Sequence, residues 1–285
     1  MIEIADNIII NTNLPGVNVG AIGTSVGVVC IDSPSNPSDA LGWFQQVRSR
    51  FGMPIRYLIL TDHSIDRALS LHTVRTRVIA HQETKKSLEE YGERFPATEL
   101  DLHASRFDLV RRELDSIPII VPHITFSQEL SLVLGDRTIT VRHEPSATAG
   151  SSWVVEHDAR VMFVGDTYIV NHHPPMHHAN LEQWYEILAE LRQSQYRRYT
   201  IVPGRGPHDQ RKTIARFAAF LSSVESLADE VDIVPDQPTD YNPQIDLILE
   251  KLQVGKESDS AIETLRQQIR INLEHLCSLR NEESE

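Results

Sequence analysis

The chain has 285 residues, of which 40% are hydrophobic and 24% are charged. A chain of this length buries a sizeable core, so we expect most of it to fold. Its 27 Lys and Arg residues stand against 40 Asp and Glu residues, which gives a formal net charge of -13. Because phosphate backbones are bound mainly by clusters of Lys and Arg, and the sequence contains no dense basic run, we expect no nucleic-acid partner.

The cysteines and the apolar runs indicate the cellular compartment in which we expect the protein. Cys30 and Cys277 lie far apart in the sequence, which is not the pattern of a disulfide framework. No apolar run approaches the roughly 20 residues that cross a bilayer. The first 13 residues carry acids where a secretory signal needs bases. We therefore expect a cytoplasmic protein that does not associate with membranes.

Strand patterns alternate with helical ones through the first 80 residues. β-Branched residues and glycines favour strands, and apolar positions at helical spacing favour helices. In chain order we expect a strand at 8–10, a hairpin at 18–31, a helix capped by Ser38 and ended by Gly52, a strand at 56–60, a short helix at 68–73 and a strand at 77–80.

Residues 85–116 are polar, charged and helical in pattern, with a break near Pro96. We interpret this segment as a solvent-facing helical insertion that shapes the entrance of a pocket.

Strand patterns return after the insertion, and the chain ends in helices. We expect strands at 124–130, 132–134, 138–143, 152–156, 161–164 and 199–202, with a helix at 180–191 among them. We then expect helices at 210–231, 245–252 and 258–279, with a Pro- and Asp-containing linker at 235–243.

The last predicted helix has heptad-like apolar positions, which favour packing either onto the domain or onto a second copy of the chain. These positions are Ile262, Leu265, Ile269, Leu273 and Leu276. Strand-rich blocks followed by helices, in two similar halves, predict two sheets sandwiched between helices. We divide the chain into a domain at 1–225 and a C-terminal helical extension at 226–285.

Five short segments, in this order and spacing, resemble motifs of the metallo-β-lactamase superfamily. They are residues 27–32 (GVVCID), 60–67 (LTDHSIDR), 146–151 (SATAGS), 163–167 (FVGDT) and 202–206 (VPGRG). The resemblance covers roughly residues 1–225. It implies an α/β fold, the αββα four-layer sandwich, here with a C-terminal helical extension.

The resemblance also implies where metal ligands would lie, and most of those positions carry other residues. The family's first-motif histidines fall on Asp62, Ser64 and Arg67, a later histidine on Ala147 and the last on Arg205, while Asp66 and Asp166 match unchanged. A register shifted by one residue would put His63 on a ligand position instead, but Asp66 would then lose its match.

These replacements disfavour an ordinary dizinc hydrolase. A catalytic zinc needs about three protein ligands and an open position for water. An arginine cannot lose its proton to become a ligand, and its charge repels a divalent ion. Carboxylates buried without a metal need another source of positive charge. We therefore predict that Arg67 and Arg205 bind Asp66 and Asp166 in the metal cavity.

The sequence leaves two functions open. The first is a non-catalytic or binding relative of the hydrolases that uses no cofactor. The alternative is a hydrolase that acts on an ester, thioester or phosphoester through a single metal ion. That ion would be zinc, iron or manganese at low occupancy, held by Asp62, Asp66 and Asp166, and the catalytic candidates are then Asp166, Asp66 and His63.

Histidines supply the remaining candidates. His63 either faces the pocket as an acid or base or caps the turn between strand and helix. Residues 172–178 (HHPPMHH) form either a metal- or substrate-binding loop or simply an exposed Pro-rich loop. Six other histidines, His103 among them, carry no recognisable constellation, and we assign them to the surface or to packing.

We expect a small molecule as the ligand of the candidate pocket. The C-terminal helices remain a candidate surface for a homodimer. The predicted pocket residues are Asp62, Ser64, Arg67, Ala147, Thr148, Arg205, His172, His173, His177 and His178.

Overall fold

The computed structural model describes residues 1–208, 211–233, 238–252 and 259–284. Seven strands form the first sheet in sequence order, antiparallel from the first to the fourth and parallel from there on. They are β1 (Ile2–Ala5), β2 (Ile8–Asn11), β3 (Val19–Thr24), β4 (Gly27–Ile31), β5 (Ile55–Ile59), β6 (Arg77–His81) and β7 (Ile124–Phe126).

The second sheet has five strands in the order β12-β11-β10-β9-β8. Its strands are β8 (Glu129–Leu134), β9 (Arg137–His143), β10 (Ser152–Glu156), β11 (Val161–Phe163) and β12 (Thr200–Val202). Neighbouring strands are antiparallel except β11 and β12, which are parallel and therefore end at the same edge.

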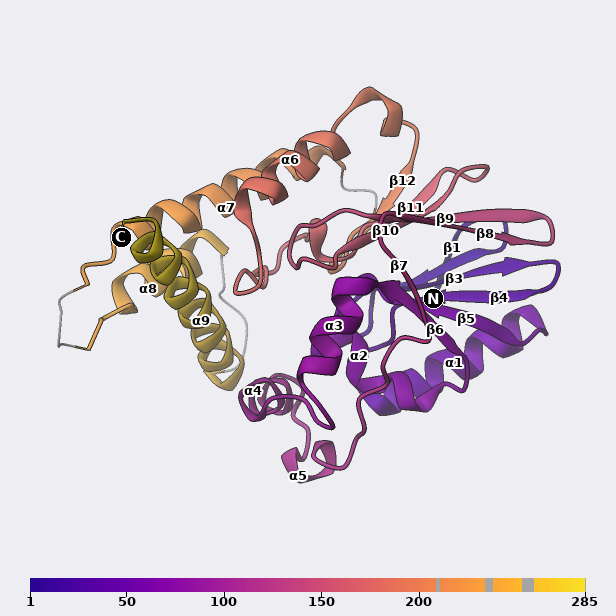
Figure 1. Cartoon of the computed structure of the whole chain (residues 1–285), viewed down its shortest axis with the longest axis horizontal. Helices are drawn as coiled ribbons and strands as arrows, with labels where there is room; N and C mark the ends of the chain where they lie inside the picture. Colours follow the sequence, from indigo (N-terminus) through magenta and orange to yellow (C-terminus); the bar gives the residue numbers. More distant parts are fainter. Residues whose placement is uncertain (209–210, 234–237, 253–258, 285) are drawn as a thin grey trace.

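Helices cover the outer face of each sheet, which gives the αββα order of layers (Figure 1). The α-helices are α1 (Pro37–Phe51), α2 (Ile65–Ala68), α3 (Gln82–Glu90), α4 (Ala97–Phe107), α5 (Arg111–Leu114), α6 (Leu181–Leu191), α7 (Ile214–Asp229), α8 (Asn242–Leu252) and α9 (Asp259–Ser284). Short 3-10 turns lie at Leu69–Thr73, Gly165–Thr167, Ser194–Tyr196 and Arg211–Thr213.

The apolar side chains form three layers of core, one between the two sheets and one between each sheet and its helices. Val29 and Ile31 of β4 face the second sheet, while Val28 and Cys30 face the helical side of the first sheet. This follows from the two-residue period of a strand, which sends successive side chains to opposite faces. Because both faces of each central strand are covered, these strands are apolar on both sides.

Two predicted boundaries are wrong for local physical reasons. Helix α1 begins at Pro37, and its N-cap is Asn36, whose side chain accepts a hydrogen bond from the Ser38 N–H. Proline at the first helical position, where its missing N–H costs nothing, fixes this start. The break predicted at residue 131 is absent, and the chain instead leaves the strand between Phe126 and Glu129, so that β8 runs unbroken to Leu134.

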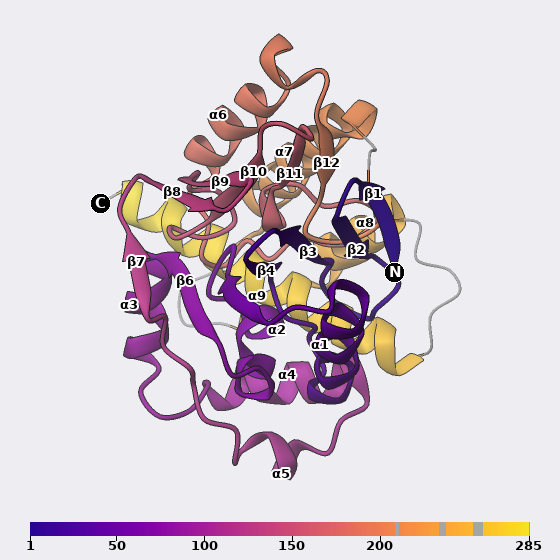
Figure 2. The same ribbon diagram turned by 90° about the vertical axis from the view of Figure 1, so that its right-hand side faces the viewer.

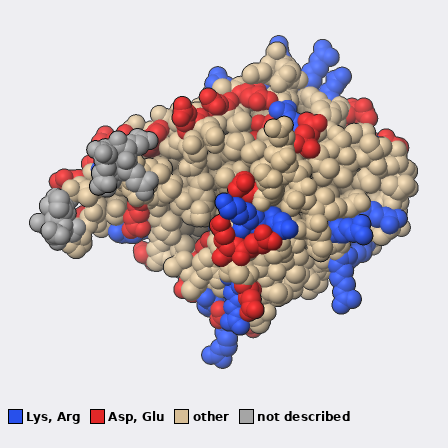
Figure 3. Space-filling view, in the orientation of Figure 1, with Lys and Arg blue, Asp and Glu red and all other residues tan. Residues whose placement is uncertain are grey.

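The helical insertion comprises α3, α4 and α5, and only part of it faces solvent. Figure 3 shows charged side chains gathered over α3, where Lys85 and Lys86 pair with glutamates of the same helix. Helix α4 instead buries His103 and contacts α2 and α9. The prediction of a solvent-facing segment is therefore wrong for α4.

The C-terminal helix α9 packs along the domain rather than projecting from it. Figures 1 and 2 show it passing close to α4 and α8, and it also contacts α7. Its Ile269, Leu273 and Leu276 are buried in the core that α6, α7 and α8 share. The predicted domain boundary after residue 225 lies within α7. Among the helices of the described ranges, none has both the length and the apolar character that crossing a bilayer demands.

Candidate functional site

The candidate site lies where strands of both sheets end. Asp32 directly follows β4, and Asp62 lies three residues beyond β5. Asp166 and Arg205 lie three residues beyond β11 and β12, which run parallel. Ligand-binding side chains gather at such an edge because parallel strands deliver the residues after them to one place.

Arg67 lies at the centre of this edge. Its side chain is 0% exposed, and its guanidinium binds both carboxylate oxygens of Asp166, with N–O distances of 2.7 and 3.0 Å. Its Nε donates to Asp32 at 3.0 Å, and its Nη1 lies 3.2 Å from Asp62 Oδ2. One buried guanidinium therefore faces three carboxylates, and its shortest contacts are with Asp166.

Arg205 connects the two aspartates that match the family motif. Its Nη1 donates to Asp66 Oδ2 at 2.7 Å, and its Nη2 donates to Asp166 Oδ2 at 3.0 Å. The side chain is 7% exposed, so these charge-assisted hydrogen bonds are largely shielded from water. Arg205 thus lies between the carboxylates that a metal ion would otherwise join.

Two side chains of the helical insertion also bind the Asp66 carboxylate. Arg106 of α4 binds its Oδ1, and the Nδ1 of His103 lies 3.0 Å from the same oxygen. The Nε2 of His103 lies 3.0 Å from the Ser35 carbonyl oxygen. Both ring nitrogens therefore face acceptors, an arrangement that a doubly protonated ring satisfies.

The arrangement differs from the sequence prediction in two respects. Arg67 contacts Asp166, Asp62 and Asp32 instead of Asp66. His103, which the sequence assigns only to the surface or to packing, is buried and bound to Asp66. The one sequence signal for His103 is its place on a face of α4 that also carries apolar residues.

Burial and neighbouring charges act in opposite directions on these carboxylates. Burial would raise the pKa of Asp66 and Asp166, but the guanidinium groups beside them outweigh it and hold both pKa values well below the usual range. Burial raises the pKa of Asp62 to about 6, because Arg67 only partly offsets it and Asp166 and Asp32 add negative charge. Asp62 is therefore less well compensated than Asp66 and Asp166.

The residues at the metal-ligand positions do not fit a metal ion. The guanidinium groups of Arg67 and Arg205 occupy positions that would have to supply neutral ligands. At two other ligand positions, the Ala147 methyl group offers no ligand, and the Ser64 hydroxyl accepts a hydrogen bond from the Asp66 N–H as the N-cap of α2. Nowhere in the described residues do three or more His, Cys, Asp or Glu side chains form a group that could hold a metal ion.

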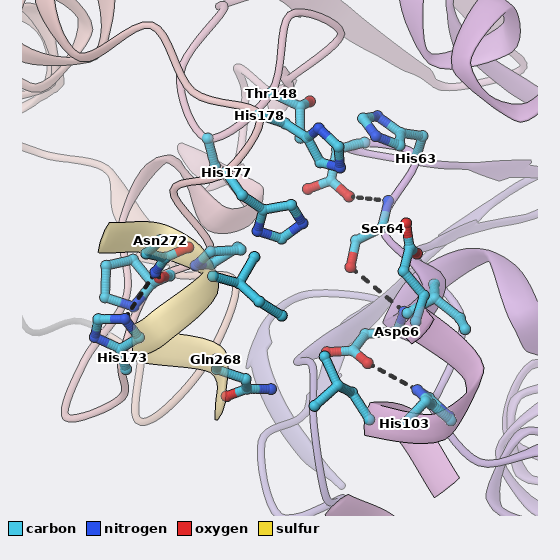
Figure 4. Close-up of a pocket in the computed structure, with 18 of the residues that line it drawn as sticks. His63, Ser64, Asp66, His103, Thr148, His173, His177, His178, Gln268 and Asn272 are labelled. Atoms are coloured by element: carbon cyan, nitrogen blue, oxygen red, sulfur yellow. Dashed lines mark hydrogen bonds and ion pairs between the residues drawn. The ribbon is translucent and has the colours of Figure 1, made fainter. Parts of the chain in front are cut away.

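A cavity of about 220 Å³ opens above this cluster. The insertion, α9 and the loop at 173–178 form its walls, and Asp62, Asp66 and Arg205 belong to its floor. Figure 4 shows His63, His177 and His178 along one part of the cavity, with Gln268 and His103 opposite. Predicted residues that line it are Asp62, His63, Ser64, Asp66, Ala147, Thr148, Arg205, His173, His177 and His178.

The remaining predicted residues lie outside the cavity lining. Arg67 and Asp166 are buried beneath its floor, and His172 turns its Nδ1 to the Val170 carbonyl oxygen at 2.8 Å. Sequence reasoning missed several other lining residues, because they come from the insertion and from α9. These are Tyr91, Thr98, Glu99, Leu102, Arg106, Gln268, Ile271 and Asn272.

His63 is 5% exposed, and Ser64 rather than His63 caps α2. Burial, with a smaller contribution from the nearby His177, lowers the pKa of His63 to about 4. The folded state therefore favours the neutral ring, so its contribution to stability is present above the unfolded pKa of about 6.5 and is lost as the pH falls towards 4.

We expect His63→Gln to reduce the loss of stability on acidification. Between pH 7 and pH 5 the unfolding free energy of the unsubstituted chain should fall by about 2 kcal/mol more than that of the variant. Urea denaturation at both pH values measures this difference, with the exposed His72→Gln as the control. Equal pH dependence in the His63 variant and the parent chain would contradict the assignment.

Gly204 lets β12 deliver Arg205 close to Asp166. A Cβ at this position would lie 2.1 Å from Asp166 Oδ1 and 2.6 Å from the Gly165 carbonyl group. We expect Gly204→Ala to destabilise the chain by about 1–3 kcal/mol or more, because it displaces a buried, ion-paired carboxylate. Thermal denaturation measures this loss of stability. The control is Gly42→Ala in α1, where an added Cβ meets nothing within 4 Å, and this substitution should stabilise the chain by about 0.5–1 kcal/mol.

Comparisons with known proteins identify the family and the fold. The family model described as "Metallo-beta-lactamase superfamily" matches residues 15–217, which is more than half of the chain. The chain belongs to the metallo-beta-lactamase superfamily. The sequence-based expectation of the family and of its four-layer fold is therefore confirmed. No curated protein matches the sequence.

Solved structures of superfamily members share the fold at low sequence identity. A metallo-beta-lactamase family protein from Thermus thermophilus is 16% identical with a TM-score of 0.68, and the match covers 98% of this chain and 95% of that protein. A beta-lactamase domain protein from Burkholderia ambifaria is 14% identical with a TM-score of 0.66, covering 99% and 88%.

A third solved structure matches a smaller part of the present chain. The metallo-beta-lactamase from Pontibacter korlensis is 16% identical with a TM-score of 0.61, and the match covers 78% of this chain and 97% of that enzyme. The Thermus and Burkholderia matches span nearly the whole chain, so they include its C-terminal helices.

Proposed function

We propose that this chain is a non-catalytic, ligand-binding member of the superfamily, in which guanidinium groups take the place of the metal ions. One observation carries the proposal: Arg205 binds Asp66 and Asp166 together, at 2.7 and 3.0 Å, in a nearly solvent-free site. The carboxylates that match the family motif thus already have cationic partners.

Energetics support the replacement. Carboxylates buried without compensating charge cost several kcal/mol each, and guanidinium groups with good hydrogen-bond geometry offset that cost. A divalent ion entering this site would have to displace Arg205 and approach Arg67, both fixed positive charges. We therefore expect the folded chain to need no metal.

The cavity above the cluster supports a binding role. It is concave and combines apolar wall residues with many polar and charged side chains, which orient a ligand in a small-molecule site. The two sheets hold its floor rigidly, and the insertion and α9 enclose it. Nothing in this proposal needs the catalytic chemistry of the metal-containing relatives.

Turnover and thermal-shift assays together test the proposal. A panel of generic ester, thioester and phosphoester substrates should give no turnover above that of an Asp166→Asn control, with or without added zinc, iron or manganese. Neither zinc nor a chelator should shift the melting temperature. Metal-dependent hydrolysis that is lost in the Asp166→Asn variant would support the single-metal hydrolase instead.

A further inference from the structure

The cavity has a small apolar interior beside charged groups. Leu102 of the insertion, Ile271 of α9 and Pro174–Pro175 of the connecting loop contribute apolar walls. A dry protein cavity of about 150 Å³ accommodates a benzene molecule. At about 220 Å³, this one accommodates a single ring with a short polar arm.

Carboxylates outnumber cations around this cavity. Three guanidinium groups, with His103 as a fourth cation when its ring is doubly protonated, face five carboxylates. The carboxylates are those of Asp32, Asp62, Asp66, Asp166 and Glu99, and the guanidinium groups are those of Arg67, Arg106 and Arg205. At least one negative charge is therefore left uncompensated.

The uncompensated charge lies on the cavity side. Asp62 is 1% exposed, and its Oδ2 receives no hydrogen bond among the described residues, although Arg67 lies 3.2 Å away. Glu99 of α4 accepts one hydrogen bond, from the Tyr91 hydroxyl at 2.9 Å, and none of the ion pairs found in the described ranges includes it.

A buried histidine lies at the same cavity as these two carboxylates. His63 lines the cavity, and its Nδ1 has no hydrogen-bond partner within the described part of the chain. Its ring lies next to those of His178 and Tyr91, with centroid distances of 5.1 and 6.1 Å. In Figure 4 the His63 and His178 rings lie side by side at the cavity. An N–H donor that carries positive charge complements such a wall.

Building on the proposed function, we propose that the cavity binds a small protonated amine with an apolar body about one ring in size. The ammonium group lies towards Asp62 and Glu99, and the ring packs between Leu102 and Ile271. The two guanidinium groups that line the cavity, Arg106 and Arg205, are already bound to aspartates. An anionic ligand would compete with those aspartates and would also meet the carboxylates of Asp62 and Glu99. The geometry therefore favours the cation.

Three ligands of matched shape test the charge preference. Isothermal titration calorimetry of the untagged full chain at pH 7.5 compares 2-phenylethylamine, 2-phenylethanol and phenylacetate. We expect the amine to bind at least about tenfold more tightly than the alcohol, because charged hydrogen bonds contribute more than neutral ones, and phenylacetate not to bind.

Substitutions at Glu99 and Asp62 test whether these two carboxylates bind the ammonium group. Glu99→Gln should weaken amine binding by about tenfold or more and leave binding of the alcohol unchanged. The matched control is Glu93→Gln, an exposed residue near the same helix, which should change neither. Asp62→Asn provides a second variant that keeps the acceptor for the Ser64 N–H.

The outcomes separate this inference from the proposed function. If phenylacetate or the alcohol binds as tightly as the amine, or if none of the three binds to folded, metal-free protein, the amine assignment fails and the guanidinium cluster stands. If the same preparation holds stoichiometric metal, the proposed function fails, whichever ligand binds.

Discussion

The Arg67→Met variant is expected to lose about 3–5 kcal/mol of unfolding free energy, as measured by urea denaturation at pH 7.5. Arg67 is fully buried and faces Asp166, Asp32 and Asp62, so its removal leaves buried negative charge without compensation. Methionine fills a similar volume, and the loss therefore reports charge rather than a cavity.

An exposed ion pair provides the control for this substitution. Arg50 binds Glu3 at 2.9 Å, but both side chains are more than 40% exposed, so Arg50→Met should cost less than about 1 kcal/mol. Adding Asp166→Asn to Arg67→Met removes one of the three carboxylate charges that Arg67 faced, while Arg205 keeps its pair with Asp66, and should restore part of the lost stability. A cost below about 1 kcal/mol for Arg67→Met would mean that Arg67 does not compensate these carboxylates.

The double variant Arg67→His with Arg205→His is expected to gain zinc binding. With Asp66 and Asp166 retained, the two new imidazoles complete four N and O ligands, the number that zinc prefers. Elemental analysis should find about one zinc per chain. Zinc should raise the melting temperature of this variant and not that of the unsubstituted chain, because binding to the folded state alone stabilises it.

Arg106 complicates this test, because it too binds Asp66. The double variant is therefore prepared with and without Arg106→Gln, and the triple variant should bind zinc more tightly. Adding Asp166→Ala should abolish the gain by removing a shared ligand. A folded double or triple variant that takes up no zinc would show that positions 67 and 205 do not surround a metal-sized space.

Much of the fold was predictable because local signals and topology agree. Asp32, Asp62, Asp166 and Arg205 each follow a strand with a strong apolar pattern, so the edge at which they meet could be inferred before their contacts were known. The spacing of the motifs then fixed their order around that edge.

The contacts of individual arginines could not be predicted from sequence. Arg67 follows Asp66 directly, but adjacent positions on a helix point in different directions, and α2 turns Arg67 towards Asp32 and Asp166 instead. Which carboxylate a long side chain reaches depends on tertiary packing rather than on spacing.

The contacts that the insertion makes with Asp66 were missed for the same reason. His103 and Arg106 reach Asp66 only because α4 packs between α2 and α9. A hydrogen bond of 2.7 Å between Ser105 Oγ and Thr264 Oγ1 joins residues 159 positions apart, and no local pattern indicates it. Much of the cavity wall therefore depends on the docking of two helices that are distant in sequence.

Elemental analysis of untagged protein, produced in medium supplemented with zinc, iron and manganese, asks most directly whether arginines have replaced the metal ions. With Arg205 between Asp66 and Asp166, the purified chain should carry no stoichiometric metal and should melt at the same temperature after dialysis against a chelator. About one or two equivalents of metal per chain, lost in the Asp166→Asn variant, would contradict it.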